Sequence, residues 1–118
     1  MKEIVAYIRP DRHFATRDAL EKAGFGAYHV ENVSGRGRQG LVYEMIEGGF
    51  ISPEYAGGQM FAKKEFTIAV ANDEVDIVIK IFLDVNQTGT KGDGKIFVLP
   101  LENAVRIRTG EQGEGALL

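Results

Sequence analysis

The sequence contains no cysteine and no tryptophan among its 118 residues. The missing thiol excludes a disulfide framework, a thiolate nucleophile and a thiolate metal site. The first residues carry no signal peptide and no apolar run approaches the length of a bilayer span, so we expect a cytoplasmic protein without direct membrane insertion. Basic residues are in the minority, because fourteen Lys and Arg stand against seventeen Asp and Glu, a net charge of -3. This balance excludes the broad cationic field of a general nucleic-acid binder and predicts that any anion site is local.

The length and a hydrophobic content of 44% predict one globular domain over residues 1–118. Alternating and helical apolar patterns predict six elements in the order βαββαβ. Asp11 is a candidate N-cap for the first helix, and Asn72 or Asp73 for the second. The predicted strands cover 3–8, 28–34, 65–70 and 96–99, and the predicted helices cover 11–23 and 73–87. This order is typical of an α/β (α+β) ferredoxin-like sandwich, with both helices on one face of an antiparallel sheet.

The segment from Gly35 to Ala62 shows neither a helical nor a strand period and contains seven glycines and Pro53. A loop of this length in a small domain is usually functional, and an additional hairpin is the alternative. The sheet face turned away from the helices would carry Val5, Tyr7 and other apolar side chains. Oligomerisation would cover that face, unless the tail after Pro100 folds back over it.

A glycine-rich turn, Gly89-Thr-Lys-Gly-Asp-Gly-Lys95, satisfies the first seven positions of the phosphate-binding pattern G-x-x-x-x-G-K. The eighth position requires Ser or Thr and holds Ile96, and the turn joins a helix to a strand rather than a strand to a helix. It is therefore not a Walker motif. Clustered glycines still allow several backbone N–H groups to converge on an anion beside Lys91 and Lys95. A tight surface turn is the equally open alternative.

Further cations lie in two other segments. Arg106 and Arg108 alternate in Val105-Arg-Ile-Arg-Thr109, which predicts that both guanidinium groups lie on one side of an extended segment. They would share an anion such as a polyphosphate, or form separate ion pairs with Glu102 or Glu111.

The start of the long loop interleaves Arg36, Arg38 and Gln39 with glycines, and Lys63 follows at its other end. Such a neck can fold around an anion or remain a solvated loop base. No catalytic residue is predicted, because the serines lie in no nucleophile elbow and the two histidines lack the spacing of metal ligands.

Two motifs together, Thr88-Gly-Thr-Lys-Gly-Asp-Gly-Lys-Ile-Phe-Val98 and Arg106-Ile-Arg-Thr-Gly-Glu111, resemble the paired signature of the PII nitrogen-regulatory signalling proteins. The resemblance covers nearly the whole chain and implies a trimer that binds ATP or ADP between neighbouring subunits and senses 2-oxoglutarate with MgATP. It also implies a T-loop at about 36–62, a B-loop at about 88–95 and a C-terminal segment at about 101–118.

The resemblance implies roles for individual residues. Gln39, Lys63 and Gly92 would bind 2-oxoglutarate, and the Gln39 amide oxygen would coordinate Mg²⁺. Arg106 and Arg108 would reach the phosphates from the adjacent subunit. The nucleotide-binding set would comprise Gly35, Gly37, Arg38, Gln39, Lys63, Thr67, Gly92, Asp93, Gly94, Lys95, Arg106 and Arg108. His29 and Ala69 occupy positions that line the adenine pocket in the family, with different side chains.

The loop neck Gly35-Arg-Gly-Arg-Gln-Gly-Leu41 departs from the common PII pattern. This atypical loop, together with Val85-Asn-Gln-Thr-Gly89 and Leu99-Pro100, is similar to the nitrogenase-associated NifI-type branch. The similarity implies direct binding to the dinitrogenase component of nitrogenase and release when 2-oxoglutarate rises. The assembly would be a homotrimer or a mixed oligomer with a related subunit. Three alternatives remain open: a PII regulator of another target such as an ammonium transporter or glutamine synthetase, a nucleotide-hydrolysing enzyme, and a structural trimer without nucleotide.

Overall fold

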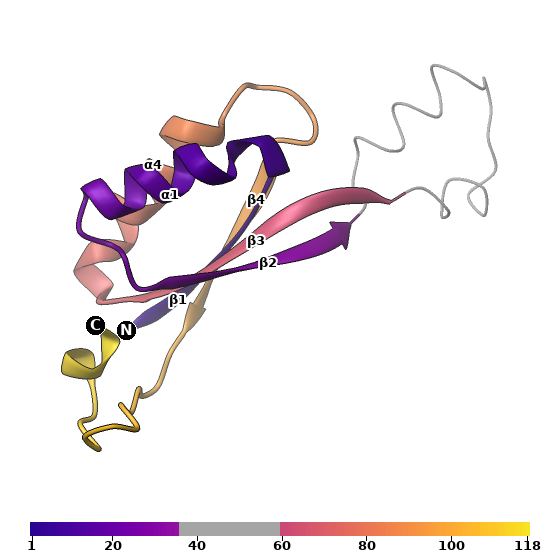
Figure 1. Cartoon of the computed structure of the whole chain (residues 1–118). Coiled ribbons are helices and arrows are strands. Elements are labelled where there is room, and N and C mark those ends of the chain that lie inside the picture. Colours follow the sequence, from indigo (N-terminus) through magenta and orange to yellow (C-terminus); the bar gives the residue numbers. More distant parts are fainter. Residues whose placement is uncertain (36–59) are drawn as a thin grey trace, which may run out of the picture.

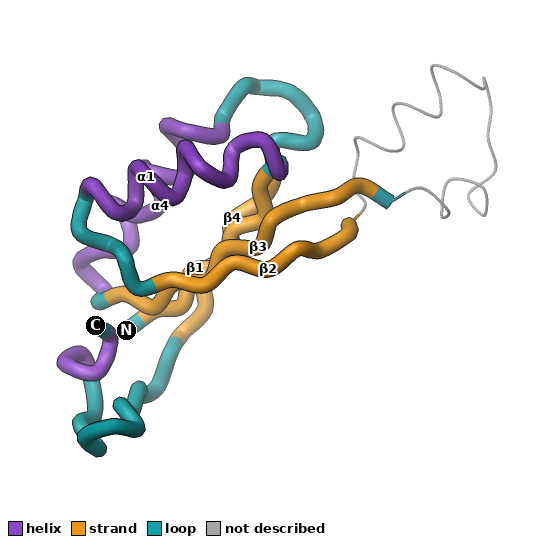
Figure 2. Tube along the Cα trace, viewed as in Figure 1, coloured by secondary structure: helices purple, strands orange, loops and turns teal. Residues whose placement is uncertain are grey.

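The computed structural model of the chain describes residues 1–35 and 60–118. In this part of the chain two helices cover one face of a four-stranded sheet, and the other face is open (Figure 1). Figure 2 shows the same two layers, with the C-terminal segment lying beyond one end of the sheet. The predicted ferredoxin-like α+β architecture is confirmed.

The sheet has the strand order β2-β3-β1-β4, and all three neighbouring pairs are antiparallel. Its strands are β1 (Lys2–Ile8), β2 (Tyr28–Gly35), β3 (Phe61–Val70) and β4 (Gly94–Pro100). The first strand therefore lies in the middle of the sheet, paired with β3 on one side and β4 on the other.

The helices are α1 (His13–Lys22) and α4 (Val75–Asn86), and each follows a 3-10 turn, Pro10–Arg12 and Asn72–Glu74 respectively. The predicted caps are wrong. Asp11 lies inside the first 3-10 turn, and no side chain caps α1. Before α4, the Glu74 carboxylate accepts a hydrogen bond from the backbone N–H of Ala71 at 3.0 Å. A carboxylate three residues into the turn satisfies the first exposed N–H, so neither Asn72 nor Asp73 is needed as a cap.

The core lies between the helices and the inner face of the sheet. Alternation in β1 and β3 sends every second side chain inward, and the helices supply the opposing layer. The buried apolar residues are Ile4, Ala6, Ile8, Leu20, Phe66, Ile68, Val70, Val78 and Phe82. One polar contact joins the helices inside this core, where Asn86 Nδ2 donates to Thr16 Oγ1 at 3.1 Å.

Two predicted loop boundaries require correction. Phe61 and Ala62, placed in the T-loop by its bounds 36–62, belong to β3, because the pairing of β2 and β3 continues as far as Gly35 opposite Phe61. Gly94 and Lys95, placed in the B-loop by its bounds 88–95, begin β4 and pair with Ile8 and Tyr7. In both places, strand pairing extends beyond the residues that show alternation.

The open face of the sheet carries apolar side chains in contact with solvent. Phe97 and Leu99 remain 48% and 41% exposed. The C-terminal segment, which ends in a short 3-10 helix over Glu114–Leu117, lies beyond one end of the sheet (Figure 1). It leaves the Phe97 and Leu99 side chains exposed. The alternative that the tail covers this part of the face is therefore wrong for the single chain. In the described residues, no helix is long and apolar enough to cross a membrane.

Candidate functional site

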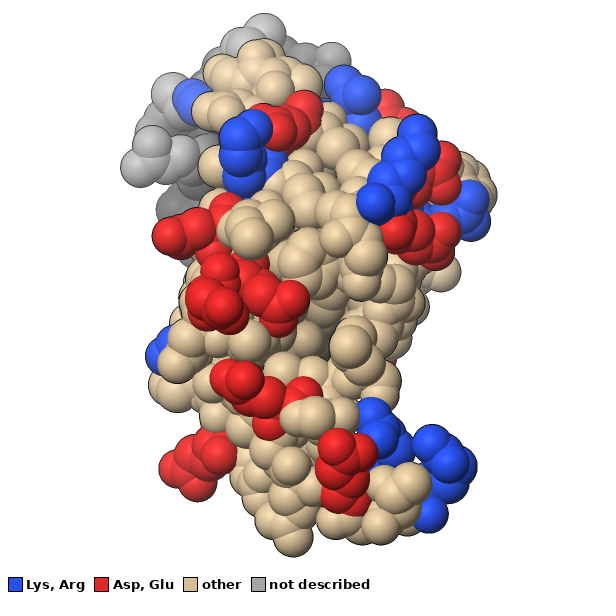
Figure 3. All heavy atoms as spheres, turned by 90° about the vertical axis from the view of Figure 1, so that its left-hand side faces the viewer, with Lys and Arg blue, Asp and Glu red and all other residues tan. Residues whose placement is uncertain are grey.

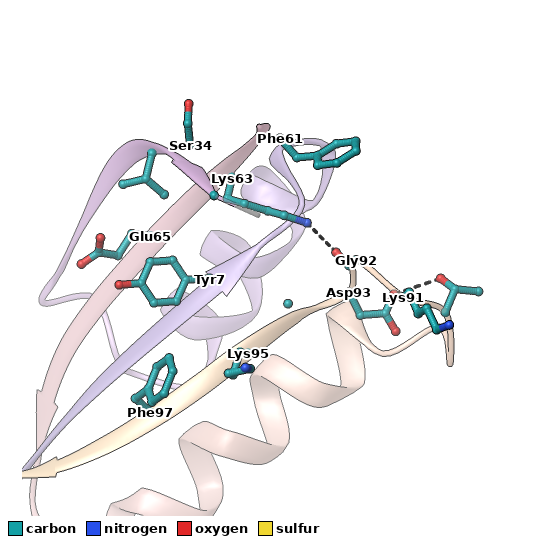
Figure 4. A pocket seen from close by; sticks show the side chains of 14 residues that line it. Tyr7, Ser34, Phe61, Lys63, Glu65, Lys91, Gly92, Asp93, Lys95 and Phe97 are labelled. Atoms are coloured by element: carbon teal, nitrogen blue, oxygen red, sulfur yellow. Dashed lines mark hydrogen bonds between the residues drawn. The ribbon is translucent and has the colours of Figure 1, made fainter. Parts of the chain in front are cut away.

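A cleft of about 880 Å³ opens where the glycine-rich turn meets the open face of the sheet (Figure 4). Its walls come from β1, β3, β4, the end of β2 and the turn itself. The lining residues are Tyr7, Val33, Ser34, Gly35, Phe61, Lys63, Glu65, Thr90, Lys91, Gly92, Asp93, Gly94, Lys95 and Phe97. Six residues predicted as ligand-binding from the sequence thus line one cleft: Gly35, Lys63, Gly92, Asp93, Gly94 and Lys95.

The turn leading into β4 depends on glycine at three positions. Gly89, Gly92 and Gly94 have φ of 83°, 102° and 119°, values that residues with a Cβ rarely adopt. At Gly94 space is limiting as well, because an added Cβ would lie 1.8 Å from the backbone oxygen of Tyr7. The turn is therefore held directly against the end of β1.

The carboxylate of Asp93 is directed into the turn. It accepts hydrogen bonds from the backbone N–H groups of Thr88 at 2.7 Å and Gly89 at 2.9 Å, and from the Thr88 hydroxyl. The Thr88 side-chain hydrogen bond, together with these backbone donors, lowers the pKa of Asp93 well below that of an ordinary carboxyl. Asp93 thus stabilises the turn with a carboxylate that is ionised at neutral pH, and this carboxylate offers no donor to a phosphate.

Backbone donors remain at the apex of the turn. The N–H of Asp93 donates to the carbonyl of Thr90 at 3.3 Å, which closes a β-turn with Lys91 and Gly92 at its centre. Within the described residues, the backbone N–H groups of Lys91 and Gly92 donate to no acceptor. Two consecutive N–H groups beside lysine side chains form an arrangement that can hold an anion.

The cationic side chains of the cleft come from β3, from β4 and from the turn itself, which contributes Lys91. Lys63 Nζ donates to the carbonyl of Gly92 at 2.7 Å, which ties β3 to the apex of the turn (Figure 4). Burial is the main reason that the pKa of Lys63 is lowered; the nearby charge of Arg9 lowers it further and Asp93 opposes this. Lys95 Nζ lies 6.0 Å from the centre of the Phe97 ring on the same strand. An anion in the cleft would therefore meet Lys63 and Lys95 from different strands.

Sequence reasoning missed three residues at this site. Tyr7 and Glu65 lie opposite one another on β1 and β3 and line the cleft, and the Tyr7 ring packs edge-to-face on Phe97 at 6.1 Å. The alternation of side chains in β1 predicted that Tyr7 lies on the open face of the sheet, but it did not indicate which residue the Tyr7 ring contacts. Arg9 contacts the turn from the end of β1 and is separated from it by more than eighty residues, so no local pattern could have indicated the contact.

The predicted extended arrangement of Arg106 and Arg108 is wrong. Val105 pairs with Gln112 in an isolated bridge, and the chain reverses between them, with the N–H of Gly110 donating to the carbonyl of Arg106 at 2.7 Å. A glycine at φ 73° completes this reversal, so local turn chemistry overrides the alternation of the side chains.

The two arginines consequently have different surroundings. The guanidinium of Arg106 pairs with the carboxylate of Glu111 and donates to the carbonyl of Gly115 at 2.8 Å and to that of Leu118. The sequence allowed a separate ion pair with Glu111 as the alternative to a shared anion, and Arg106 forms this ion pair. The Arg108 side chain is exposed and forms no ion pair in the part of the chain that the structure describes.

The segment after β4, which carries both arginines, lies at the far end of the sheet from the glycine-rich turn (Figure 1). Neither lines the cleft of its own chain. Figure 3 shows basic side chains toward both ends of one face of the molecule and acidic side chains between them. Among the described cations predicted to bind an anion, Lys63 and Lys95 therefore line the cleft, whereas Arg106 and Arg108 do not.

The remaining predicted residues are more scattered. Thr67 faces His29 across β2 and β3 on the open face, and Ala69 follows on the same strand, but none of these lines the cleft. Gly37, Arg38 and Gln39 lie outside the described residues. No group of three His, Cys, Asp or Glu that could hold a metal ion is found within 1–35 and 60–118. The expected Mg²⁺ contact through Gln39 therefore stays a prediction.

Comparison with known proteins identifies the family. A family model described as "Nitrogen regulatory protein P-II" matches residues 1–111. A nitrogen fixation nifHD region GlnB-like protein 2 from Methanothermobacter marburgensis is 41% identical over 121 residues, covering 99% of this chain and all of the relative. A nitrogen regulatory protein P-II 2 from Methanothermobacter thermautotrophicus is 40% identical over 117 residues, covering 99% and 97%.

The fold is matched by a solved structure as well. The crystal structure of Arabidopsis thaliana PII bound to citrate superposes with a TM-score of 0.75 at 34% sequence identity, covering 98% of this chain and 88% of that one. The chain therefore belongs to the P-II family of nitrogen regulatory proteins, in the nitrogenase-associated branch whose members are named for the nitrogen-fixation nifHD region.

Proposed function

We propose that this protein is a nitrogen-status regulator that binds ATP or ADP together with 2-oxoglutarate and controls a target protein by direct binding. The observation that supports it best is the composition of the cleft. Two backbone N–H groups that have no acceptor within residues 1–35 and 60–118, those of Lys91 and Gly92, lie beside Lys63 and Lys95. Backbone donors and ammonium groups together suit the oxygens of a polyphosphate.

The nucleotide site requires a second copy of the chain or a related subunit. Arg106 and Arg108 do not line the cleft of their own chain, and the segment after β4 that carries them lies at the other end of the sheet from the glycine-rich turn (Figure 1), so they would contribute to the cleft of a neighbour. The exposed apolar side chains of the open face, including Phe97 and Leu99, would be covered in the same assembly. A trimer, uniform or mixed with a related subunit, satisfies both requirements.

The effector would bind where the cleft meets the long loop. Lys63 offers an ammonium group to one carboxylate of 2-oxoglutarate beside Gly92, whose carbonyl Lys63 contacts. Gln39 would provide an amide oxygen to Mg²⁺, which would join the effector to the ATP phosphates. Because Lys63 now donates to the Gly92 carbonyl, ligand binding would exchange that contact for a stronger charged one.

The proposed target is the dinitrogenase component of nitrogenase, with inhibition relieved by 2-oxoglutarate. Relatives named for the nifHD region support this assignment. Residues 36–59 would carry the contact with the target, since they lie between the two strands that border the cleft. The effector would then act by differential affinity for two arrangements of that segment. We propose a cytoplasmic location and no catalytic turnover. A regulator of an ammonium transporter or of glutamine synthetase is the alternative within the same family.

Calorimetric titration with 2-oxoglutarate, with and without MgATP, tests the proposal. We expect effector binding only with MgATP, and its loss in Gln39→Ala and Arg38→Ala. Lys95→Ala should weaken ATP binding itself, whereas Lys80→Ala, which removes an exposed lysine paired with Asp84 on α4, should not. ATP binding without any 2-oxoglutarate response would reduce the proposal to an adenylate sensor. Steady ATP hydrolysis abolished by Lys95→Ala would favour an enzyme.

A pull-down against nitrogenase, at low and at high 2-oxoglutarate, tests the target. Retention of the dinitrogenase component at low effector and release at high effector is the expected result. Retention of glutamine synthetase or an ammonium transporter in its place would transfer the regulation to that target.

A further inference from the structure

Arg9, the residue after β1, is the only described side chain that joins the end of this central strand to three residues of the glycine-rich turn. Its Nη2 atom donates to Thr90 Oγ1 at 3.1 Å and to the carbonyl of Lys91 at 3.0 Å. The same nitrogen lies 3.4 Å from Asp93 Oδ1. The Arg9 side chain is 28% exposed, so these contacts are partly shielded from water.

The contact with the Lys91 carbonyl bears on the type of the turn. Thr90 to Asp93 form a β-turn, closed by the N–H of Asp93 on the carbonyl of Thr90. Gly92 is its third residue and has φ of 102°, which is the mark of a type II turn. Types I and II differ chiefly in the orientation of the central peptide, which here joins Lys91 to Gly92.

That orientation determines where a backbone donor points. In a trans peptide the carbonyl oxygen and the following N–H point in opposite directions. Because Arg9 binds the carbonyl of Lys91, the N–H of Gly92 is directed to the other side of the peptide plane. This N–H is one of the two in the turn without an acceptor among the described residues.

Lys63 restrains the next peptide in the same way. Its Nζ binds the carbonyl of Gly92 at 2.7 Å, and the following N–H, that of Asp93, points back to Thr90. The peptides on the two sides of Gly92 are thus held by two cations, Arg9 just after β1 and Lys63 in β3. Of these two peptides, the one held by Arg9 has an N–H without an acceptor among the described residues.

We infer that Arg9 is a positioning residue that fixes the Lys91–Gly92 peptide in its type II orientation, so that the N–H of Gly92 is presented to a phosphate group. The inference deepens the proposed nucleotide-binding function and depends on it for the identity of the ligand. The orientation of the peptide does not depend on that function. Arg9 itself need not touch the ligand.

The test compares Arg9→Met, which keeps an unbranched apolar side chain but removes every donor, with Arg12→Met as a matched control. Arg12 lies three residues further on and loses the same charge, and its side chain makes no hydrogen bond within 1–35 and 60–118. Two readouts are required. One is the sequential NOE between the Lys91 Hα and the Gly92 amide proton, which is strong in a type II turn and weak in type I. The other is the ATP dissociation constant from calorimetry.

We expect Arg9→Met to weaken that NOE and to raise the ATP dissociation constant about tenfold, the usual effect of losing one hydrogen bond to a charged group. Arg12→Met should change neither. Arg9→Lys should restore part of both, because an ammonium group can donate to the same carbonyl from a shorter side chain.

Two results would overturn the inference. An unchanged NOE in Arg9→Met would show that the turn holds its type without Arg9. A lost NOE with unchanged ATP affinity would show that the N–H of Gly92 is not used for the ligand. If the wild-type protein bound no ATP, the proposed function would fail, and the NOE comparison would still decide whether Arg9 sets the turn.

Discussion

At one end of the sheet the cations border an open cleft, whereas at the other end the principal cation is already satisfied by its own chain. Lys63 and Lys95 lie with the glycine-rich turn, whose apex retains backbone donors without acceptors in the described residues. Arg106 binds Glu111 and two backbone carbonyls of the C-terminal segment. The first region is ready for an anion, and the second must exchange partners before it can contribute to one.

The largest effect on the free energy of unfolding is expected when one glycine at each end of the sheet is replaced by alanine. Gly94→Ala would place a Cβ 1.8 Å from the Tyr7 oxygen at φ 119° and should destabilise the protein by about 3 kcal/mol or more. Gly110→Ala, at φ 73° with open space around it, should cost about 1–2 kcal/mol. Urea unfolding at one fixed protein concentration gives both values. Equal losses would mean that the turn is not held against β1.

Mixing two inactive variants would show whether the two ends meet in neighbouring copies. Lys95→Ala and Arg106→Ala should each lose most ATP binding as uniform assemblies. Unfolded together and refolded, they should recover about a quarter of the clefts, those in which one copy supplies Lys95 and its neighbour Arg106. Calorimetry counts the recovered sites. No recovery would place both residues on the same copy or remove Arg106 from the site.

A smaller, pH-dependent effect should follow from Asp93→Asn. The pKa of Asp93 is lowered in the folded protein, first by the Thr88 hydroxyl, so its stabilising effect is present above the ordinary carboxyl pKa and is lost as the pH falls through the depressed value. The variant should be less stable than the wild type at neutral pH, and the difference should shrink in strongly acidic solution.

Urea unfolding from pH 7 down to pH 2 measures this difference. Asp11→Asn, at an exposed aspartate that caps no helix, provides the comparison and should show no such trend. A constant difference between Asp93→Asn and the wild type over this range would contradict the role of the ionised carboxylate in the turn.

The smallest effect concerns the partner of Arg106. Glu111→Gln removes the charge that holds the guanidinium while keeping an acceptor, and the Glu111 side chain is 47% exposed. Exposed ion pairs are worth up to about 1 kcal/mol, so ATP should bind up to about fivefold more tightly. Glu102→Gln is the matched control at an exposed glutamate in the same segment. Weaker ATP binding in Glu111→Gln would mean that Glu111 orients Arg106 for the ligand.

The element order could be predicted from the sequence because the core residues themselves carry the periods. Ile4, Ala6 and Ile8 alternate in β1, and Val78 and Phe82 repeat on one side of α4; all five are buried. The glycine-rich turn was also predictable as a special conformation, since its glycines adopt positive φ. The helices and strands and the glycine-rich turn are determined by residues that are close together in the sequence, so a sequence pattern can predict them.

The remaining features depend on neighbours in space. The contact of Arg9 with Lys91 joins residues 82 positions apart, and the extension of β3 to Phe61 depends on its register with β2. The sequence predicted an extended segment at Arg106 and Arg108 because their side chains alternate with apolar ones. Short hairpins show the same alternation, and the chain in fact reverses between Arg106 and Glu111. A glycine after two arginines was the signal that could have indicated the turn.

The pairing of Gly35 with Phe61 has a consequence for protein engineering. The sheet brings the two ends of the intervening segment to adjacent positions, so the closure of this segment is determined by the β2 and β3 ladder and not by its own length. Doubling the length of such an insertion costs only about 0.6 kcal/mol in chain entropy. The segment between Gly35 and Phe61 can therefore be exchanged between family members while the β2 and β3 ladder is kept, provided that the proposed ligand contacts Arg38 and Gln39 are retained. Such an exchange would test whether this segment carries target recognition.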